Sequence, residues 1–243
     1  MTIETTELRP LAHKLALLAR LDDAALEAIT ALPFETREVD ASHHLVREGQ
    51  TSPACCLLLE GYACRHKLAA DGGRQIVSFH MRGDLLDAQH LLLSIADHNV
   101  QTITRAKVAW IPKTDILRLT RQYPVIAEAI WKDTLIDASV FREWVLNVGR
   151  RDAKSRIAHM LCEFVARCEV AGLGSPDSFE VPMTQEQIAD ATGLTPVHVN
   201  RMIGALERDG VIARDKRQFH VADWAKLRDV ADFRPEYLHS AAA

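Results

Sequence analysis

Residues 184–210, TQEQIADATGLTPVHVNRMIGALERDG, carry the signals of two short helices joined by a tight turn. Thr184 is a preferred N-cap residue, and Gln187, three positions later, completes a capping box. Gly193 stands where a left-handed residue commonly ends a helix. The pattern therefore predicts a first helix that begins after Thr184 and ends at Gly193.

A second helix is predicted directly after this turn. Thr195 is another preferred N-cap, and Pro196 suits the first helical position because its missing N–H would have no partner there. Its apolar stripe at helical spacing consists of Val199, Met202, Ile203 and Leu206. The opposite face carries Val197, His198, Asn200, Arg201, Gly204 and Arg208. Such a helix can lie in the DNA major groove, where Asn200 can pair with adenine and Arg201 with guanine or a phosphate.

The residues after this helix decide between DNA binding and an ordinary helical hairpin packed in a core. Two apolar, strand-like runs, residues 211–213 (VIA) and 218–221 (QFHV), flank the charged turn 214–217 (RDKR). Helix capping is compatible with either interpretation, whereas a hairpin of strands beside the second helix is typical of a winged helix. The sequence therefore favours a winged helix-turn-helix that binds DNA.

Residues 184–212 resemble the DNA-binding module of the cAMP receptor protein/fumarate and nitrate reduction (CRP/FNR) family of bacterial transcription regulators. The resemblance implies that Arg201 reads a base and that Thr184 contacts a phosphate. Family members often have a glutamate where this chain has Val197, so we expect a different half-site preference. Charge alone makes the wing residues Lys216 and Arg217 candidates for phosphate contacts. The predicted DNA-binding set is Thr184, Thr195, Pro196, Val197, His198, Asn200, Arg201, Lys216 and Arg217.

Bulk properties allow one large or two modest globular domains, because the 243 residues are 48% hydrophobic and 26% charged. The net charge is −4 with a pI near 6.3, so DNA binding has to come from a local basic patch. The N-terminus MTIETTELRP does not resemble a secretory signal, and no apolar run is long enough to span a bilayer. We expect a cytoplasmic protein, and structural disulfides are not expected from its five cysteines.

The first half of the chain combines a helical start with a β-rich module. Residues 8–32 have a helical pattern, in which Asp22 caps a second short helix. Glycine turns then separate strand candidates at residues 55–59, 62–68, 75–80, 100–104 and 107–111. Regular short strands of this kind predict a small β-sandwich or barrel. The family resemblance implies a β-roll sensor domain, a jelly-roll-like double-stranded β-helix, and thus an α+β fold for the whole chain.

A long helix is predicted from residue 123 to about 148, after a short helix at 113–119. A coiled-coil-like seam runs along it at spacings of four and three: Ile130, Thr134, Ala138, Phe141, Val145 and Val148. A helix packed only on its own domain is the alternative. The resemblance implies that this helix is the axis of a homodimer that presents two recognition helices to a palindromic operator.

These elements divide the chain into three parts. Residues 1–122 form the sensor domain, residues 123–150 the dimerisation helix and hinge, and residues 151–243 the DNA-binding domain. Residues 149–151 (GRR) are the hinge candidate, and Asp152 caps the helix that follows.

The effector pocket of the family's cyclic-nucleotide members uses a glycine, a glutamate and an arginine. In this chain Asp87 and Ala88 stand where that glycine and glutamate are expected, and the arginine's place falls near Asn99 or Val100. A phosphate needs a cation or N–H donors, and Asp87 would repel it. The sequence therefore argues against cyclic AMP. The pocket candidates are Arg82, Gly83, Asp84, Asp87, Ala88 and Asn99.

Other cofactors are weighed by their ligand requirements. An iron–sulfur cluster needs four thiolates, and the first cysteine here is Cys55, with no C-x-x-C spacing anywhere, which argues against a cluster. Cys55, Cys56 and Cys64 either fill strand cores or form a redox switch. The eleven histidines show no recognised metal spacing, so we predict no metal site, while haem is left open.

Enzyme function is not predicted, because the chain has neither a phosphate-binding glycine loop nor a nucleophile elbow. A cupin-like metalloenzyme would need paired histidines that are missing. We therefore predict a homodimeric CRP/FNR-type regulator, an activator through RNA polymerase or a repressor. The alternative is a cyclic-nucleotide-binding-like, redox-sensing or haem-sensing protein in which the sensor function dominates.

Overall fold

The computed structural model describes residues 7–175, 179–215 and 218–239. The chain forms two compact units. The first comprises Met1–His66 and Phe79–Ala138, and the second comprises Lys67–Ser78 and Ser139–Ala243.

Two short helices open the first unit, as predicted. Helix α1 spans Arg9–Leu18 and helix α2 spans Asp23–Thr30. The Asp22 carboxylate accepts a 2.8 Å hydrogen bond from the Ala25 N–H, which confirms the predicted cap. Both helices contribute buried apolar side chains to a core that they share with strand residues of the β-roll.

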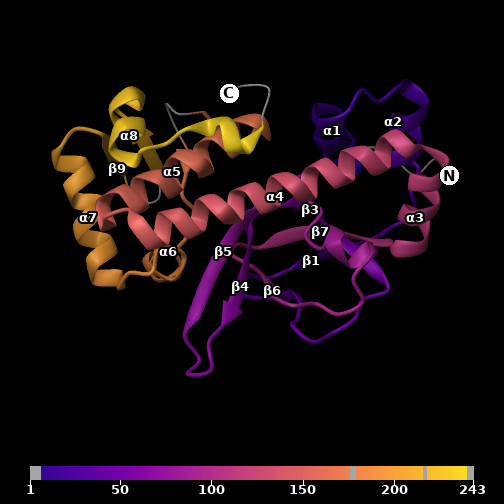
Figure 1. Cartoon of the computed structure of the whole chain (residues 1–243), viewed down its shortest axis with the longest axis horizontal. Coiled ribbons are helices and arrows are strands. Elements are labelled where there is room, and N and C mark those ends of the chain that lie inside the picture. The colour runs from indigo at the N-terminus through magenta and orange to yellow at the C-terminus, as the bar shows by residue number, and fades with distance from the viewer. Residues whose placement is uncertain (1–6, 176–178, 216–217, 240–243) are drawn as a thin grey trace. The chain divides into compact units, whose positions relative to one another are not determined.

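The β-roll consists of two antiparallel sheets, ordered β1-β7-β3 and β2-β6-β4-β5 (Figure 1). The strands are β1 (Glu35–Val39), β2 (His44–Val46), β3 (Ala54–Glu60), β4 (Ala63–Leu68), β5 (Arg74–His80), β6 (Asn99–Thr102) and β7 (Ala106–Pro112). Each of the five strand candidates between residues 55 and 111 is confirmed. Strands β1 and β2 were not predicted, because β1 is an exposed, polar edge strand and β2 has only three residues.

Helix α3 (Lys113–Gln122) leads into the long helix α4 (Pro124–Arg150), which runs as one continuous coil in Figure 1. The predicted hinge at 149–151 is therefore narrower than expected, since Gly149 and Arg150 belong to α4. Only Arg151 and Asp152 separate α4 from α5 (Ala153–Val170). The physical reason is the Asp152 side chain, which accepts hydrogen bonds from the Lys154 and Ser155 N–H groups and starts the new helix at once.

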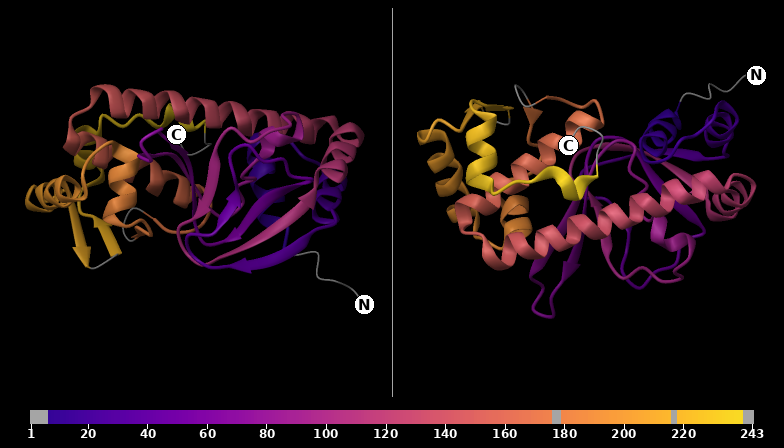
Figure 2. Two further views of the ribbon diagram at one scale, coloured as in Figure 1. Left: turned by 90° about the horizontal axis from the view of Figure 1, so that it is seen from below. Right: turned by 45° about the horizontal axis from the view of Figure 1, so that its top comes forward.

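The remainder of the second unit is a winged helix-turn-helix with a C-terminal extension. Its elements are β8 (Phe179–Glu180), α6 (Gln185–Thr192), α7 (Pro196–Arg208), β9 (Ile212–Asp215) and β10 (Gln218–Val221), with the sheet order β8-β10-β9. The β9–β10 hairpin lies beside α7 (Figure 2). Residues 179–183 (FEVPM) also have the pattern of a strand, but β8 comprises only the first two of them. Helix α8 (Trp224–Ala231) and the 3-10 helix η2 (Pro235–Leu238) were not predicted.

Candidate nucleic-acid interface

The start of α6 is fixed by the predicted capping box. The Thr184 hydroxyl accepts a 3.2 Å hydrogen bond from the Gln187 N–H, and the Gln187 side-chain oxygen accepts one of 2.9 Å from the Thr184 N–H. Gly193 ends the helix with φ 66°, the left-handed conformation that glycine adopts without strain. These contacts hold the two helices of the motif at a defined turn.

Helix α7 begins as predicted and divides into a buried and an exposed face. The Thr195 hydroxyl accepts a 3.3 Å hydrogen bond from the His198 N–H, and Pro196 occupies the first helical position. Val199, Ile203 and Leu206 are buried among α5, α6 and β9. The packing of this stripe leaves the other face of α7 available to a partner.

The outward face of α7 brings together most of the predicted DNA-binding residues. Val197 is 82% exposed, Asn200 and Arg201 are exposed, and His198 is half-buried. The exposed residues Thr184, Thr195 and Pro196 lie at the N-termini of α6 and α7. Lys216 and Arg217 fall outside the described residues.

Sequence reasoning missed one residue on this surface, Gln185. Its side-chain amide donates a 3.2 Å hydrogen bond to the Asn200 side-chain oxygen, which joins the first residue of α6 to the outward face of α7. The only signal for it in the sequence was an amide at the first position of the predicted helix.

Acidic side chains partly neutralise the basic residues near the wing. Arg214 pairs with Glu207 at 3.5 Å, and Lys154 pairs with Asp209. The hydrogen bond from Lys154 lowers the pKa of the Asp209 carboxyl. These ion pairs reduce the positive charge near the wing, in keeping with the net charge of −4 for the whole chain.

Three of the predicted effector residues, Asp87, Asn99 and Gly83, form hydrogen bonds with backbone groups of their own unit. Asp87 is fully buried and accepts a 2.9 Å hydrogen bond from the Cys56 N–H. Asn99 is buried and accepts one of 3.1 Å from the Glu48 N–H. Arg82 is exposed, whereas Asp84 and Ala88 are buried. Gly83 has φ 92° and donates its N–H to the Leu58 carbonyl at 2.8 Å.

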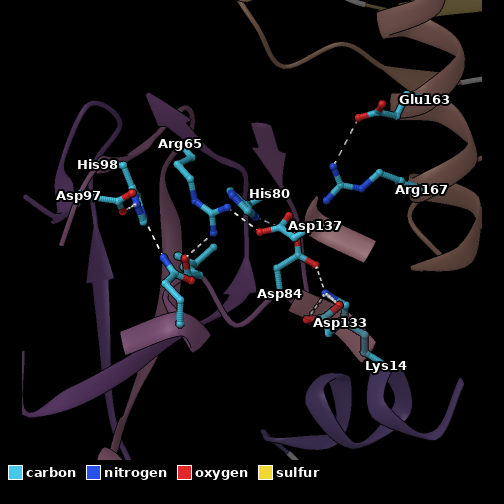
Figure 3. A network of polar contacts seen from close by, with 12 residues as sticks. Lys14, Arg65, His80, Asp84, Asp97, His98, Asp133, Asp137, Glu163 and Arg167 are labelled. Atoms are coloured by element: carbon cyan, nitrogen blue, oxygen red, sulfur yellow. Dashed lines mark hydrogen bonds and ion pairs between the residues drawn. The ribbon is translucent and has the colours of Figure 1, made fainter. Parts of the chain in front are cut away.

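The cation in this interior is Arg65, which sequence reasoning did not single out. It is 4% exposed; its guanidinium donates to the Asp137 carboxylate of α4 at 2.5 Å and to the Leu86 carbonyl at 2.9 Å (Figure 3). The only signal in the sequence was an arginine inside a strand-like run, ACRHKL. The Asp137 carboxylate of α4 thus already binds the guanidinium that would otherwise be available to an anionic ligand.

A second ion pair network lies in the same unit. The Lys14 ammonium contacts the carboxylates of Asp84 and Asp133, each at 2.9 Å (Figure 3). Burial by itself would lower the pKa of Lys14, but Asp133 and Asp84 together raise it above its ordinary value. The network joins α1, the turn after β5 and α4 through partly buried charges.

Two histidines and two cysteines in this interior have pKa values shifted toward the neutral form of the side chain. Burial lowers the pKa of His80, and burial with the nearby Arg65 charge lowers that of His98 to about 4. Burial and the Asp87 carboxylate raise the pKa values of Cys55 and Cys56, which disfavours the thiolate that a redox switch requires. Cys64 is buried too. Among the described residues no group of three or more histidine, cysteine or acidic side chains could hold a metal ion.

Comparison with known proteins agrees with both halves of the fold. Residues 36–123 match the family model of the cyclic nucleotide-binding domain, and residues 155–230 match that of the Crp-like helix-turn-helix domain. The solved structure of FixK2 from Bradyrhizobium japonicum matches 82% of this chain and 98% of its own length with a TM-score of 0.74 at 22% identity, a likeness of fold. These matches define a DNA-binding regulator with a cyclic-nucleotide-binding-like domain.

Curated relatives identify the family. The nitrogen fixation regulation protein FixK of Bradyrhizobium diazoefficiens is 32% identical over 174 residues, 72% of each chain. The transcriptional activator protein FnrL of Cereibacter sphaeroides is 27% identical over 226 residues, 91% of this chain and 90% of the relative. The chain therefore belongs to the CRP/FNR family of transcription regulators, and it is a sequence-specific DNA-binding regulator, as predicted.

The same relatives are regulators and not enzymes, which confirms the prediction that this chain is no enzyme. In the part of the chain that the structure describes, no helix has the length and apolar character needed to cross a membrane.

Proposed function

We propose that this regulator binds a palindromic operator as a homodimer, with one copy of α7 in each of two successive major grooves. The observation that carries the proposal is the division of α7, whose apolar stripe is buried while Val197, Asn200 and Arg201 point outward. In a two-fold dimer the two recognition helices would lie roughly 34 Å apart, one turn of the duplex.

Each outward side chain has a distinct chemistry for base reading. The Arg201 guanidinium can donate two hydrogen bonds to guanine, and the Asn200 amide can pair with adenine. The exposed isopropyl group of Val197 fits the methyl group of thymine. His198 would touch a base or a phosphate from its half-buried position.

Phosphate contacts would fix the register of α7 in the groove. Thr184 and Thr195, with Pro196, lie where helix N-termini favour an anion. Lys216 and Arg217 would add wing contacts by charge.

The dimer axis in this proposal is α4. Its exposed apolar side chains include Trp131 (68% exposed), Leu135 (54%) and Val145 (75%). Ile130, from the predicted seam, instead packs on the core of its own unit. The remaining seam residues, Thr134, Ala138, Phe141 and Val148, are half-buried. We therefore widen the proposed dimer contact to include Trp131 and Leu135 beside Ala138 and Val145.

The sensor half would respond to a signal other than cyclic AMP. Arg65 is already bonded to Asp137 and Leu86, and the buried Asp87 carboxylate would repel a phosphate. We retain the division into a sensor domain (1–122), a dimerisation helix (123–150) and a DNA-binding domain (151–243).

Two further features follow from the proposed role. A regulator whose target is bacterial DNA works in the cytoplasm. RNA polymerase would be its second partner if it activates transcription. The relative FnrL is named a transcriptional activator.

The test is a selection of random duplex DNA by the full chain, combined with light scattering after gel filtration. We expect an inverted repeat to be enriched and a mass twice that of the chain. Enrichment of a single half-site, or a monomer both free and on DNA, would contradict the proposal.

A further inference from the structure

The hydrogen bond between Gln185 and Asn200 connects the two helices of the DNA-binding motif on their exposed side. Its donor is the side-chain nitrogen of Gln185, and its acceptor is the side-chain oxygen of Asn200, at 3.2 Å. Both residues are exposed, so the bond serves no core. It lies on the surface where α7 presents its base-reading candidates.

The backbone at both ends of this bond is held in place. The capping box between Thr184 and Gln187 fixes the first turn of α6, which contains Gln185. The Thr195 cap and the buried stripe fix α7. The Leu194 N–H also donates to the Ala189 carbonyl at 3.1 Å across the turn. The two amides are thus presented to each other by rigid elements, and the bond costs little backbone entropy to form.

The bond determines which way the Asn200 amide faces. A primary amide has one oxygen that accepts two hydrogen bonds and one nitrogen that donates two. Gln185 uses one acceptor site of the oxygen, and the structure gives Asn200 no other side-chain bond among the described residues. One acceptor site and both donors remain, which is the pattern that pairs with N6 and N7 of adenine in the major groove.

We propose that Gln185 is a positioning residue that orients Asn200 for adenine and thereby sets the base preference at one position of each half-site. This inference rests on the proposed base-reading role of Asn200. Gln185 would contact no base itself. Its second amide hydrogen is available for a phosphate beside the N-terminus of α6, which would link the backbone contact to the base contact.

A simple phosphate contact is the competing role for Gln185, and it makes a different prediction. Phosphates carry no sequence information, so loss of such a contact weakens binding to every duplex alike. Loss of a positioning residue instead lowers the preference between base pairs at one position. The two roles are therefore distinguished by the ratio of the affinities for duplexes that differ at this one base pair. The overall affinity can fall in either case.

The experiment uses the full chain and the duplex enriched by selection, with each of the four base pairs placed in turn at the position read by Asn200. For Gln185→Met we expect the preference for A·T to fall by about 3-fold to 10-fold, the effect of one neutral hydrogen bond. The preference at the position read by Arg201 should stay unchanged. In Asn200→Ala the A·T preference should disappear, and adding Gln185→Met should lower it no further.

A second substitution reverses the bond. In Gln185→Glu the side chain can only accept, so Asn200 has to turn its nitrogen toward position 185. The A·T preference should then fall at least as far as in Gln185→Met. Retention of the full preference in this variant would overturn the proposal.

Glu186→Met is the matched control, because Glu186 is the adjacent exposed residue and takes the same replacement. It should change the affinity for all four duplexes equally, and unchanged thermal unfolding should show that every variant is folded. Equal weakening of all four duplexes by Gln185→Met would overturn the positioning role and leave that of Asn200 intact. No effect of Asn200→Ala on base preference would instead overturn the base-reading role proposed for Asn200.

Discussion

Two arginines in this molecule show how differently one residue type is used in its two units. Arg65 is buried in the first unit and bonded to a carboxylate and a carbonyl. Arg201 is exposed on α7 of the second unit, where the described residues offer it no ion pair. A guanidinium satisfied within the chain contributes to the fold, whereas one directed at solvent is available for a partner. The contrast predicts that stability and DNA recognition can be changed separately.

Removal of the Asp137 carboxylate should have the largest effect on stability. Asp137→Ala takes away the carboxylate closest to a buried guanidinium, and loss of one partner of such a pair costs about 3 kcal/mol. Urea unfolding of the full chain would measure the loss. The base preference of the folded variant should match that of the unchanged protein.

The double substitution Arg65→Met with Asp137→Leu is the control for this result. It removes both charges together, and apolar replacements of similar size often leave stability nearly unchanged. A double variant as unstable as Asp137→Ala would mean that the ion pair is not the cause.

Arg201→Ala should show the opposite behaviour. It removes an exposed side chain, so the free energy of unfolding should stay within about 0.5 kcal/mol. Discrimination at one base pair of the operator should fall by about 1–3 kcal/mol. Gel-shift titrations on the four duplexes would measure it, and equal loss on operator and random DNA would count against base reading.

The second unit contains a buried carboxylate too, which sharpens the comparison. Glu163 accepts hydrogen bonds from the Trp144 indole at 3.0 Å and the Tyr237 hydroxyl at 2.7 Å. Burial and the Glu163 charge raise the pKa of Tyr237. Tyr237→Phe removes one bond to a charged group and should cost about 1.5 kcal/mol in thermal unfolding. Unchanged stability would mean that the C-terminal extension adds nothing to the fold through this contact.

The sequence predicts the features that depend on local spacing, and it does not predict the contacts between distant residues. Caps, the turn glycine and the outward face of α7 depend on local spacing, and the structure agrees with each of them. The bonds of Arg65 with Asp137 and of Gln185 with Asn200 join residues 72 and 15 positions apart, and no local pattern specifies such pairs. Strand β1 was not predicted, because its side chains are nearly all exposed and its sequence shows no alternation of apolar and polar residues.

Asp152 differs from these long-range pairs, because its capping role was predicted from the sequence. Its contribution to the stability of the fold depends on pH. Its carboxylate caps α5 by accepting hydrogen bonds from the Ser155 and Lys154 N–H groups, at 3.0 and 2.9 Å. The bond from the Ser155 N–H lowers the pKa of this carboxyl below its ordinary value. A lowered pKa in the folded state means that the stabilisation is present above the ordinary pKa and is lost as the pH falls through the folded one.

Asp152→Ala should therefore cost about 1 kcal/mol near pH 6, the usual value of an N-cap. The difference from the unchanged protein should shrink once the pH falls below about 4, where the unfolded carboxyl takes up its proton. Asp152→Asn is the matched control, since its amide oxygen can cap the helix without titrating. Urea unfolding at a series of pH values would measure all three proteins. A cost for Asp152→Ala that stays constant down to pH 2.5 would show that the ionised carboxylate is not what stabilises the junction of α4 and α5.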